Sequence, residues 1–149
     1  MTNGRVLWVD HATKAATLRT VAEIPGLLRD GGGWLWLDIP EPDDETARQL
    51  TDMFGLHPTA VRDVLERNHV PRLHLYGETL FLVLNRPEPG EHGHVHYLEL
   101  DQFVGANYLV TTHGPRNPAV PLERLLEETD DVAAKMLAGR FQPASPTTV

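Results

Sequence analysis

One short stretch of the chain limits the possible folds more than any other. Residues 34–39, Trp-Leu-Trp-Leu-Asp-Ile, are almost entirely apolar, so both faces of an extended strand here would avoid water. A strand at the surface alternates polar and apolar residues, whereas a strand covered on both sides does not. The stretch therefore predicts an inner strand of a sheet that carries helices on each face.

The remaining pattern supplies the other strands and helices of such a fold. Further strands are expected at 5–10, about 15–21, 72–76, 79–86, 95–104 and 107–112, and helices at about 22–30, 44–54, 58–68 and 118–139. The segment 87–93 is rich in Pro, Gly and Glu and is expected to be an exposed, mobile loop. The order of elements predicts an α/β fold of the α+β type, in which a mixed parallel and antiparallel sheet is sandwiched between helices (α/β/α).

Helix ends are marked in the middle of the chain. Asp43 is a suitable N-cap for the helix that follows it, and Gly55 occupies the position after its last turn, where a left-handed conformation is common. Pro58 is placed in the first turn of the next helix, where its missing N–H group costs little.

Composition excludes several classes of protein. The 149 residues suffice for one domain, and a net charge of −8 argues against binding to nucleic acid, which requires clustered Lys and Arg. The chain contains no cysteine, so thiolate metal sites and disulfides are excluded. No apolar run approaches the ~20 residues that span a bilayer. We expect a soluble, cytoplasmic segment that does not itself contact the membrane.

Catalytic motifs are also missing from the sequence. It contains neither a Gly-x-Ser-x-Gly elbow, nor a phosphate-binding loop ending in Lys-Ser/Thr, nor a His-Glu-x-x-His pair. We therefore expect that the chain is not an enzyme and has no catalytic residues.

Three alternating histidines form one candidate metal site. His92, His94 and His96 would share one face of a strand, so their imidazoles could converge on zinc or nickel. This pattern suggests a free-standing intracellular metal-binding or sensor module. The alternative is a set of solvated loop histidines, because Gly93 and the preceding Pro-Gly-Glu are typical of a turn.

Asp63 is a second candidate. It lies about 200° around the predicted helix from the apolar Val61, on the opposite face, where it is available to a cation or a partner. The alternative is an exposed ion pair with Arg67, four residues later, which would contribute only about 0.3–0.5 kcal/mol.

A family resemblance gives these residues a context. The stretch 54–73, Phe-Gly-Leu-His-Pro-Thr-Ala-Val-Arg-Asp-Val-Leu-Glu-Arg-Asn-His-Val-Pro-Arg-Leu, resembles the signature of the N-terminal domain of CorA-type magnesium transporters. The strands at 34–38, 80–84 and 107–113 fit the same pattern, so the resemblance covers about 5–140. Zinc-transporting relatives share this outline, which therefore does not determine the metal.

The resemblance implies a cytosolic α/β/α domain that a stalk helix connects to two transmembrane helices, with a Gly-Met-Asn motif at the pore and five subunits in the assembly. The present sequence contains no Gly-Met-Asn motif and no pore helices. Asp63 matches the acidic residue that holds a regulatory Mg²⁺ ion between subunits, opposite a carboxylate on the neighbouring stalk. The residue before it is often acidic in the family but is Arg62 here, which should weaken cation binding.

The last residues suggest a connection to more chain. Ser145-Pro146 is a typical helix start, and the alternative is a plain disordered terminus. Together with the family resemblance, the motif implies that residues 1–142 form the domain and that 143–149 begin a truncated link to the next helix. The sequence thus predicts the cytosolic regulatory, metal-sensing domain of a homopentameric transporter at the cytoplasmic face of the membrane. Mg²⁺ is the expected regulatory ion, other divalent cations being possible, and the His92/His94/His96 module is the alternative.

Overall fold

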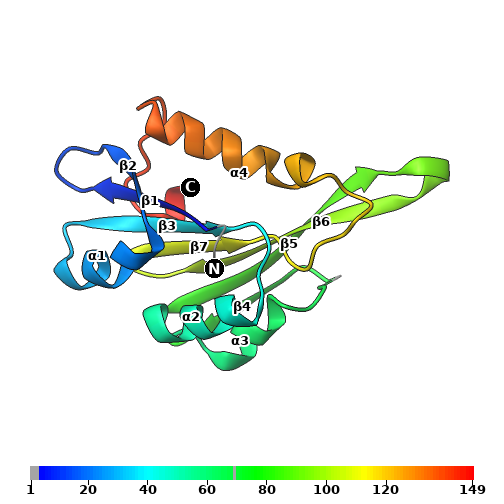
Figure 1. The fold of residues 1–149 in the computed structure, drawn as a ribbon, viewed down its shortest axis with the longest axis horizontal. Helices are drawn as coiled ribbons and strands as arrows, with labels where there is room; N and C mark the ends of the chain where they lie inside the picture. Colours follow the sequence, from blue (N-terminus) through cyan, green and yellow to red (C-terminus); the bar gives the residue numbers. More distant parts are fainter. Residues whose placement is uncertain (1–3, 69) are drawn as a thin grey trace.

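The computed structural model describes residues 4–68 and 70–149 (Figure 1). The strands of this part of the chain are β1 (Arg5–Asp10), β2 (Ala16–Arg19), β3 (Gly33–Ile39), β4 (Arg72–Tyr76), β5 (Thr79–Pro89), β6 (Val95–Val104) and β7 (Tyr108–Thr112). Its helices are α1 (Ile24–Asp30), α2 (Asp44–Phe54), α3 (Pro58–Asp63) and α4 (Leu122–Leu137), with short 3₁₀ turns η1 (Val21–Glu23), η2 (Glu91–Gly93) and η3 (Pro146–Thr148).

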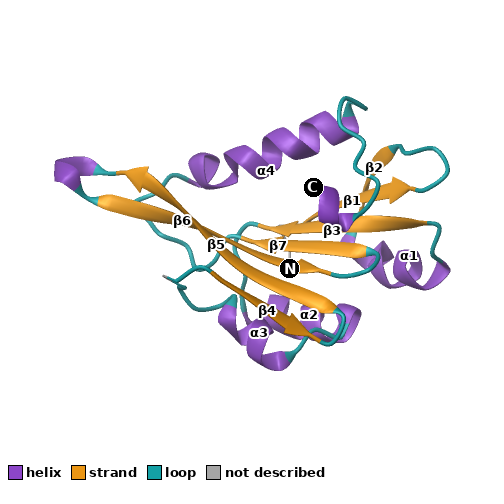
Figure 2. Ribbon diagram, turned by 180° about the vertical axis from the view of Figure 1, so that it is seen from behind, coloured by secondary structure: helices purple, strands orange, loops and turns teal. Residues whose placement is uncertain are grey.

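All seven of these strands form one sheet in the order β2-β1-β3-β7-β6-β5-β4. β3 and β7 run parallel, and every other neighbouring pair is antiparallel. Helices α1, α2 and α3 lie on one side of the sheet and α4 on the other (Figure 2). The predicted mixed sheet between helical layers is therefore confirmed.

β3 is the buried strand that residues 34–39 predict. All of its residues are buried, and it lies between β1 and β7. Trp34 and Trp36 pack with Met136 of α4 on one face, while Leu35 and Leu37 join the core beneath α1–α3 on the other. A strand with a core on each side needs apolar residues at every position, which explains its lack of alternation.

The two ends of α2 also agree with the sequence-based prediction. Asp43 Oδ1 accepts a hydrogen bond from the Thr46 N–H at 2.8 Å, which caps α2, and Gly55 ends that helix with a φ of 63°. This left-handed conformation strains residues that have a Cβ atom, so glycine is favoured there. The two ends fix the length of the helix that packs Leu50 against the sheet.

α4 covers only part of its side of the sheet. Its apolar residues pack mainly on β1, β3 and β7, whereas the corresponding face of β4 and of the adjoining parts of β5 and β6 is less well covered. Six leucines lie there, paired across neighbouring strands, and we call them the leucine face: Leu73, Leu75, Leu80, Leu82, Leu84 and Leu100. Leu73 and Leu75 are 63% and 64% exposed. Large apolar side chains that lie exposed next to one another are candidates for an interaction surface.

The prediction of an exposed, mobile loop at 87–93 is wrong in part. β5 continues to Pro89 and pairs with β6 as far as Val95, so a long hairpin projects from the body of the molecule (Figure 1). Pro87 and Pro89 are two residues apart, so both missing N–H groups face the same edge of β5. Beyond Val83 that edge has no strand beside it, and proline is tolerated on such edges.

The end of the chain returns to the sheet. η3 contacts β3 and β7, and Pro143 and Pro146 are buried. Ser145 precedes the turn as its N-cap residue, as the sequence suggested. The link to further chain at 143–149 stays a prediction.

Candidate cation site around Asp63

Asp63 is the last residue of α3. The start of the helix is capped by His57, whose Nδ1 accepts a hydrogen bond from the Thr59 N–H at 3.2 Å. Val61 is buried in the core, and Asp63, two residues later, lies on the outer side with 22% of its side chain exposed. The predicted outward position of Asp63 is therefore confirmed.

The helix that carries Asp63 is shorter than predicted. It was expected to reach Asn68 but ends at Asp63, because Asn68 takes part in a different set of hydrogen bonds. The side-chain Nδ2 of Asn68 donates to the carbonyl oxygens of Asp63 (2.8 Å) and Glu66 (3.1 Å) just beyond the end of the helix, where carbonyl groups lack helical partners. Its backbone N–H donates to Glu99 Oε2 at 3.0 Å, so the chain turns towards β6.

The ion-pair partner of Asp63 is also not Arg67, the residue considered from helical spacing. Arg72, the first residue of β4, donates from Nη2 to Asp63 Oδ2 at 2.5 Å, whereas Arg67 Nη2 donates to the Pro115 carbonyl at 3.4 Å. The chain reverses near Pro71 and brings the start of β4 beside the end of α3. Helical spacing cannot reveal a partner that lies beyond the helix.

The carboxamide of Asn68 has one possible orientation. Its Nδ2 faces three acceptors, namely the carbonyls of Asp63 and Glu66 and Glu99 Oε1 at 3.0 Å. The amide must therefore present nitrogen to that side and Oδ1 to the other. Oδ1 accepts from Arg72 Nη2 at 3.2 Å, the same nitrogen that contacts Asp63. Two oxygens thus converge on one positively charged nitrogen.

Behind Asn68 lies a buried pair of acidic residues on β6. Glu99 and Asp101 are 5% and 0% exposed. Burial raises the pKa of Asp101 to about 9, and the adjacent charge of Glu99 and a hydrogen bond to it act in the same direction; the Thr112 hydroxyl and the charge of Arg72 oppose them. At neutral pH Asp101 therefore keeps its proton and donates it to the Glu99 carboxylate.

The donor set at Asp63 fits a hydrated divalent cation. Mg²⁺ prefers carboxylate and carbonyl oxygens, keeps several waters, and is held by one or two carboxylates. Asp63 Oδ2 and Asn68 Oδ1 are oxygens of these two kinds, and both already surround a cationic nitrogen. Within the described residues no three His, Cys, Asp or Glu side chains form a group that could hold a metal.

The three histidines lie at the far end of the hairpin. His92 belongs to η2 with a φ of 54°, His94 follows the turn, and His96 is in β6, so they do not share one face of a strand. All three border an open hollow of about 760 Å³ between the hairpin and the start of α4, together with Glu88 and Arg124. Their role as metal ligands stays a prediction.

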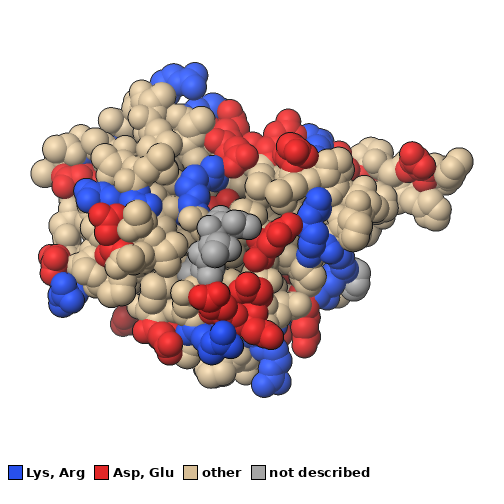
Figure 3. All heavy atoms as spheres, viewed as in Figure 1, with Lys and Arg blue, Asp and Glu red and all other residues tan. Residues whose placement is uncertain are grey.

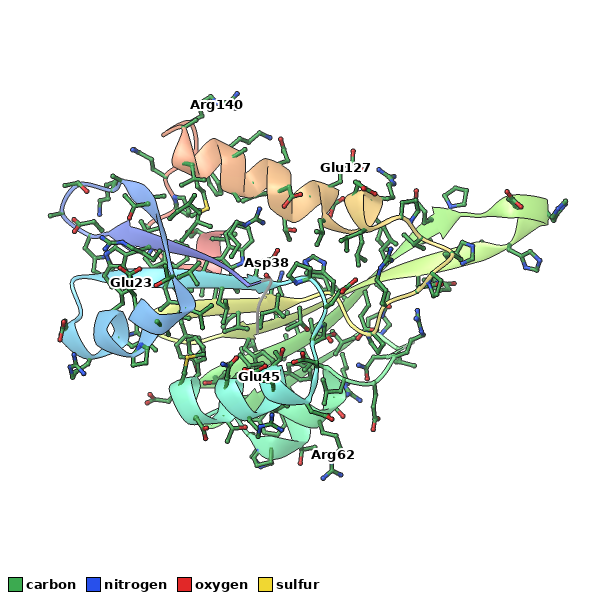
Figure 4. All side chains as sticks on the ribbon, viewed as in Figure 1. Glu23, Asp38, Glu45, Arg62, Glu127 and Arg140 are labelled. Atoms are coloured by element: carbon green, nitrogen blue, oxygen red, sulfur yellow. The ribbon has the colours of Figure 1, made fainter. Side chains whose placement is uncertain are left out.

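A second polar cluster lies on the α4 side of the sheet. Asp38 is 2% exposed, and its Oδ1 accepts hydrogen bonds from the Thr111 hydroxyl (2.5 Å) and His113 Nε2 (2.9 Å). Arg5 contacts its other oxygen at 3.3 Å, and Trp36 Nε1 donates to Thr111 at 2.9 Å. Asp38 lies inside the molecule between the sheet and α4 (Figure 4). The cluster joins β1, β3 and β7 and has a structural role.

Asn68 and Arg72 are parts of the site that the sequence pattern did not predict. Both lie within the stretch 54–73, and Asn is common where a helix ends, which is the one local signal of its capping role. No local signal pairs Arg72 with Asp63, because nine residues and a chain reversal separate them.

No helix in the described part of the chain has both the length and the apolar character needed to cross a membrane. The profile of the CorA-like Mg²⁺ transporter protein family matches residues 31–149. This chain belongs to that family. The match includes β3, α3 and the Asp63 site of this CorA-like chain, and it confirms the resemblance inferred from 54–73.

Individual relatives agree with this assignment. The CorA-like chain is 29% identical over 99 residues to YfjQ of Bacillus subtilis (strain 168), a protein named as a metal ion transporter. The match covers 65% of this chain and 30% of YfjQ. The chain therefore spans about a third of the length of this curated relative.

Three solved structures have the same fold as the CorA-like chain. The full-length CmaX protein has a TM-score of 0.66 at 22% identity, covering 92% of this chain and 39% of CmaX. The CorA magnesium transporter of Methanocaldococcus jannaschii has a TM-score of 0.62 at 15% identity, covering 89% and 37%. The ZntB cytoplasmic domain of Vibrio parahaemolyticus has a TM-score of 0.66 at 15% identity, covering 97% and 52%.

Proposed function

We propose that this chain is the cytosolic regulatory domain of a CorA-like divalent-cation transporter and that it has no catalytic activity. In this proposal it binds Mg²⁺ through Asp63 and thereby controls a pore formed by other parts of the protein. The observation that carries the proposal is the convergence of Asp63 Oδ2 and Asn68 Oδ1 on one cationic position in a member of this family. The likeness of its fold to the ZntB cytoplasmic domain supports a place on the cytoplasmic side of the membrane.

The physical basis of regulation would be charge. The chain carries a net charge of −8, so neighbouring copies repel each other, and acidic groups occur on the face drawn in Figure 3. A divalent cation between Asp63 and a carboxylate of the next subunit would offset this repulsion and favour the closed state. Loss of the ion at low internal Mg²⁺ would shift the population towards an open state.

The assembly in this proposal is a homopentamer. Each chain would continue from residues 143–149 into a stalk and two transmembrane helices that form the pore. The transported cation is a separate question from the regulatory one, because the residues that select it would line that pore. Mg²⁺ is the regulatory ion we propose, and other divalent cations that accept oxygen ligands could replace it.

The proposal is tested in the full-length transporter. Asp63→Ala should raise the Mg²⁺ concentration at which ion flux into proteoliposomes is half-inhibited by about tenfold, because a charged ligand is lost. Asp52→Ala removes the same charge from an exposed position of α2 and should leave that concentration nearly unchanged. An unchanged Mg²⁺ dependence in the Asp63 variant would refute Asp63 as the sensor.

A second candidate is a transition-metal site on the hairpin. His92, His94 and His96 border one hollow, which supports it, although their imidazoles would have to rearrange to bind one ion. Calorimetry with Zn²⁺ and Ni²⁺ tests it: micromolar binding that disappears in the triple His→Ala variant supports this site, and an unchanged heat signal in that variant excludes it.

A further inference from the structure

We propose that Arg72 competes with the divalent cation for the oxygens of Asp63 and Asn68, and so sets the concentration at which the site responds. The inference rests on the proposed function and assigns Arg72 and Asn68 to the same site. Arg72 is then an internal counter-ion that holds the site in its metal-free form.

The first argument is that both cations need the same position. Arg72 Nη2 lies 2.5 Å from Asp63 Oδ2 and 3.2 Å from Asn68 Oδ1. Mg²⁺ binds oxygen at about 2.0–2.1 Å. An ion bound to Asp63 Oδ2 on this side would overlap the guanidinium and would also repel it. Metal binding therefore requires Arg72 to leave.

The second argument is that the oxygens stay when Arg72 leaves. The Asn68 amide is held by three hydrogen bonds from Nδ2, to the carbonyls of Asp63 and Glu66 and to Glu99 Oε1, none of which involves Arg72. Oδ1 therefore keeps its direction. The Asp63 carboxylate follows directly from the end of α3, whose Val61 is anchored in the core. Asn68 Oδ1 is therefore preorganised for a cation, and the Asp63 carboxylate lies beside it at the anchored end of α3.

The third argument is that Arg72 can move at small cost. Its side chain is 44% exposed, and β4 is an edge strand of the sheet. An exposed ion pair contributes at most about 1 kcal/mol, so its replacement by a bound ion is within reach of weak metal binding. This free energy corresponds to about a fivefold change in affinity, which is the amount by which Arg72 should raise the dissociation constant.

Arg62 provides a matched comparison. It precedes Asp63 in the sequence and carries the same charge, but it points away from the molecule (Figure 4) and makes no ion pair with any described residue. It can act on the site only through its screened electric field. The two arginines therefore separate direct competition from general electrostatic repulsion.

The experiment is a titration of the 149-residue chain with MgCl₂ at constant ionic strength, followed by amide NMR signals of residues around Asp63. Arg72→Gln should lower the dissociation constant about fivefold, and Arg62→Gln less than twofold. Asp63→Asn should abolish the Mg²⁺-dependent shifts in both the native and the Arg72→Gln background. In the native chain the Arg72 Nε–H signal should shift with Mg²⁺ as the guanidinium is released, a result that needs no variant.

Three results would overturn the inference. They are an equal gain in affinity for the two arginine variants, an unchanged affinity in Arg72→Gln, and shifts in that variant that do not depend on Asp63. A dispersed amide spectrum confirms that each variant is folded, and the Arg72 Nε–H signal decides the matter if one is not. The flux measurement with Asp63→Ala remains independent: if it succeeds while Arg72→Gln has no effect, only the competition is refuted.

Discussion

At the scale of residues, two buried carboxyl groups on opposite faces of the sheet avoid the cost of an isolated charge in different ways. Asp38 is surrounded by Arg5, Thr111 and His113, whose donors compensate its charge. Asp101 lies beside another acid, so it keeps a proton instead. A buried carboxyl must be either paired or neutral, because an unpaired buried charge is strongly unfavourable.

The Asp38 cluster gives a prediction for stability. Asp38→Ala should lower the free energy of unfolding in urea by about 3–5 kcal/mol, because it leaves a partly buried Arg5 and two buried polar groups without their partner. Asp131→Ala removes an exposed pair with Lys135 on α4 and should cost about 0.5 kcal/mol or less. Equal effects of the two substitutions would show that the cluster does not hold β1, β3 and β7 together.

Asp101 gives a prediction for pH. Its pKa is near 3.8 in the unfolded chain and about 9 in the folded protein, so between these values folding takes up a proton. The contribution of Asp101 to the free energy of unfolding is therefore highest below pH 4. It falls as the pH rises to 9, by up to about 1.4 kcal/mol per pH unit. Asp101→Asn replaces the neutral acid with a neutral amide, so its stability relative to the native chain should increase from pH 5 to pH 8. A constant difference in urea unfolding across this range would contradict a protonated Asp101.

At the scale of elements, the start of β3 depends on close backbone packing. Gly33 precedes the apolar run 34–39 and is the first residue of β3. A Cβ atom there would lie 2.2 Å from the Val9 carbonyl oxygen and 2.6 Å from the Trp8 ring. The glycine therefore allows β1 and β3 to pair beneath a tryptophan.

Two glycine substitutions test this packing. Gly33→Ala should destabilise the protein by at least about 2 kcal/mol, since backbone atoms would have to move. Gly26→Ala lies in α1, where the new Cβ would meet only Arg29 at 3.6 Å, and should stabilise the protein by up to about 1 kcal/mol through helix propensity. Thermal unfolding of both variants provides the measurement. A Gly33→Ala variant as stable as the native chain would rule out the close approach.

At the scale of the whole molecule, the two faces of the sheet are covered unequally. Strands are about 4.8 Å apart and a helix is about 10 Å wide, so one helix covers about two or three strands. Of the α-helices in residues 4–68 and 70–149, α1, α2 and α3 lie on one face and α4 on the other, so the leucine face is covered less completely. The layering predicted from the sequence is correct, but it is incomplete over β4–β6.

The leucine face gives a prediction for the isolated chain. A dye that fluoresces on apolar surfaces should bind to the folded protein, and the double variant Leu73→Lys with Leu75→Lys should bind it clearly less. Both leucines are exposed on an edge strand, where lysine is well tolerated, so the free energy of unfolding should change by no more than about 0.5 kcal/mol. Equal dye binding by both proteins would place the apolar surface elsewhere.

Features that arise within one helix or strand could be predicted from the order of the residues. The apolar run at 34–39 predicted a doubly covered strand, Asp43 and Gly55 predicted the ends of α2, and helical periodicity placed Asp63 on the outer face. These predictions succeed because neighbouring residues fix the direction of a side chain within a helix or strand. The family resemblance in 54–73 likewise depends on residue order alone.

Which side chains meet depends on the path of the chain through the fold. Arg72 reaches Asp63 from nine residues away, Glu99 reaches Asn68 from 31, and His113 reaches Asp38 from 75. The early end of α3, the long β5–β6 hairpin and the protonated state of Asp101 follow from such contacts. Local patterns cannot predict them, because each depends on the path of the chain and on how deeply a group is buried.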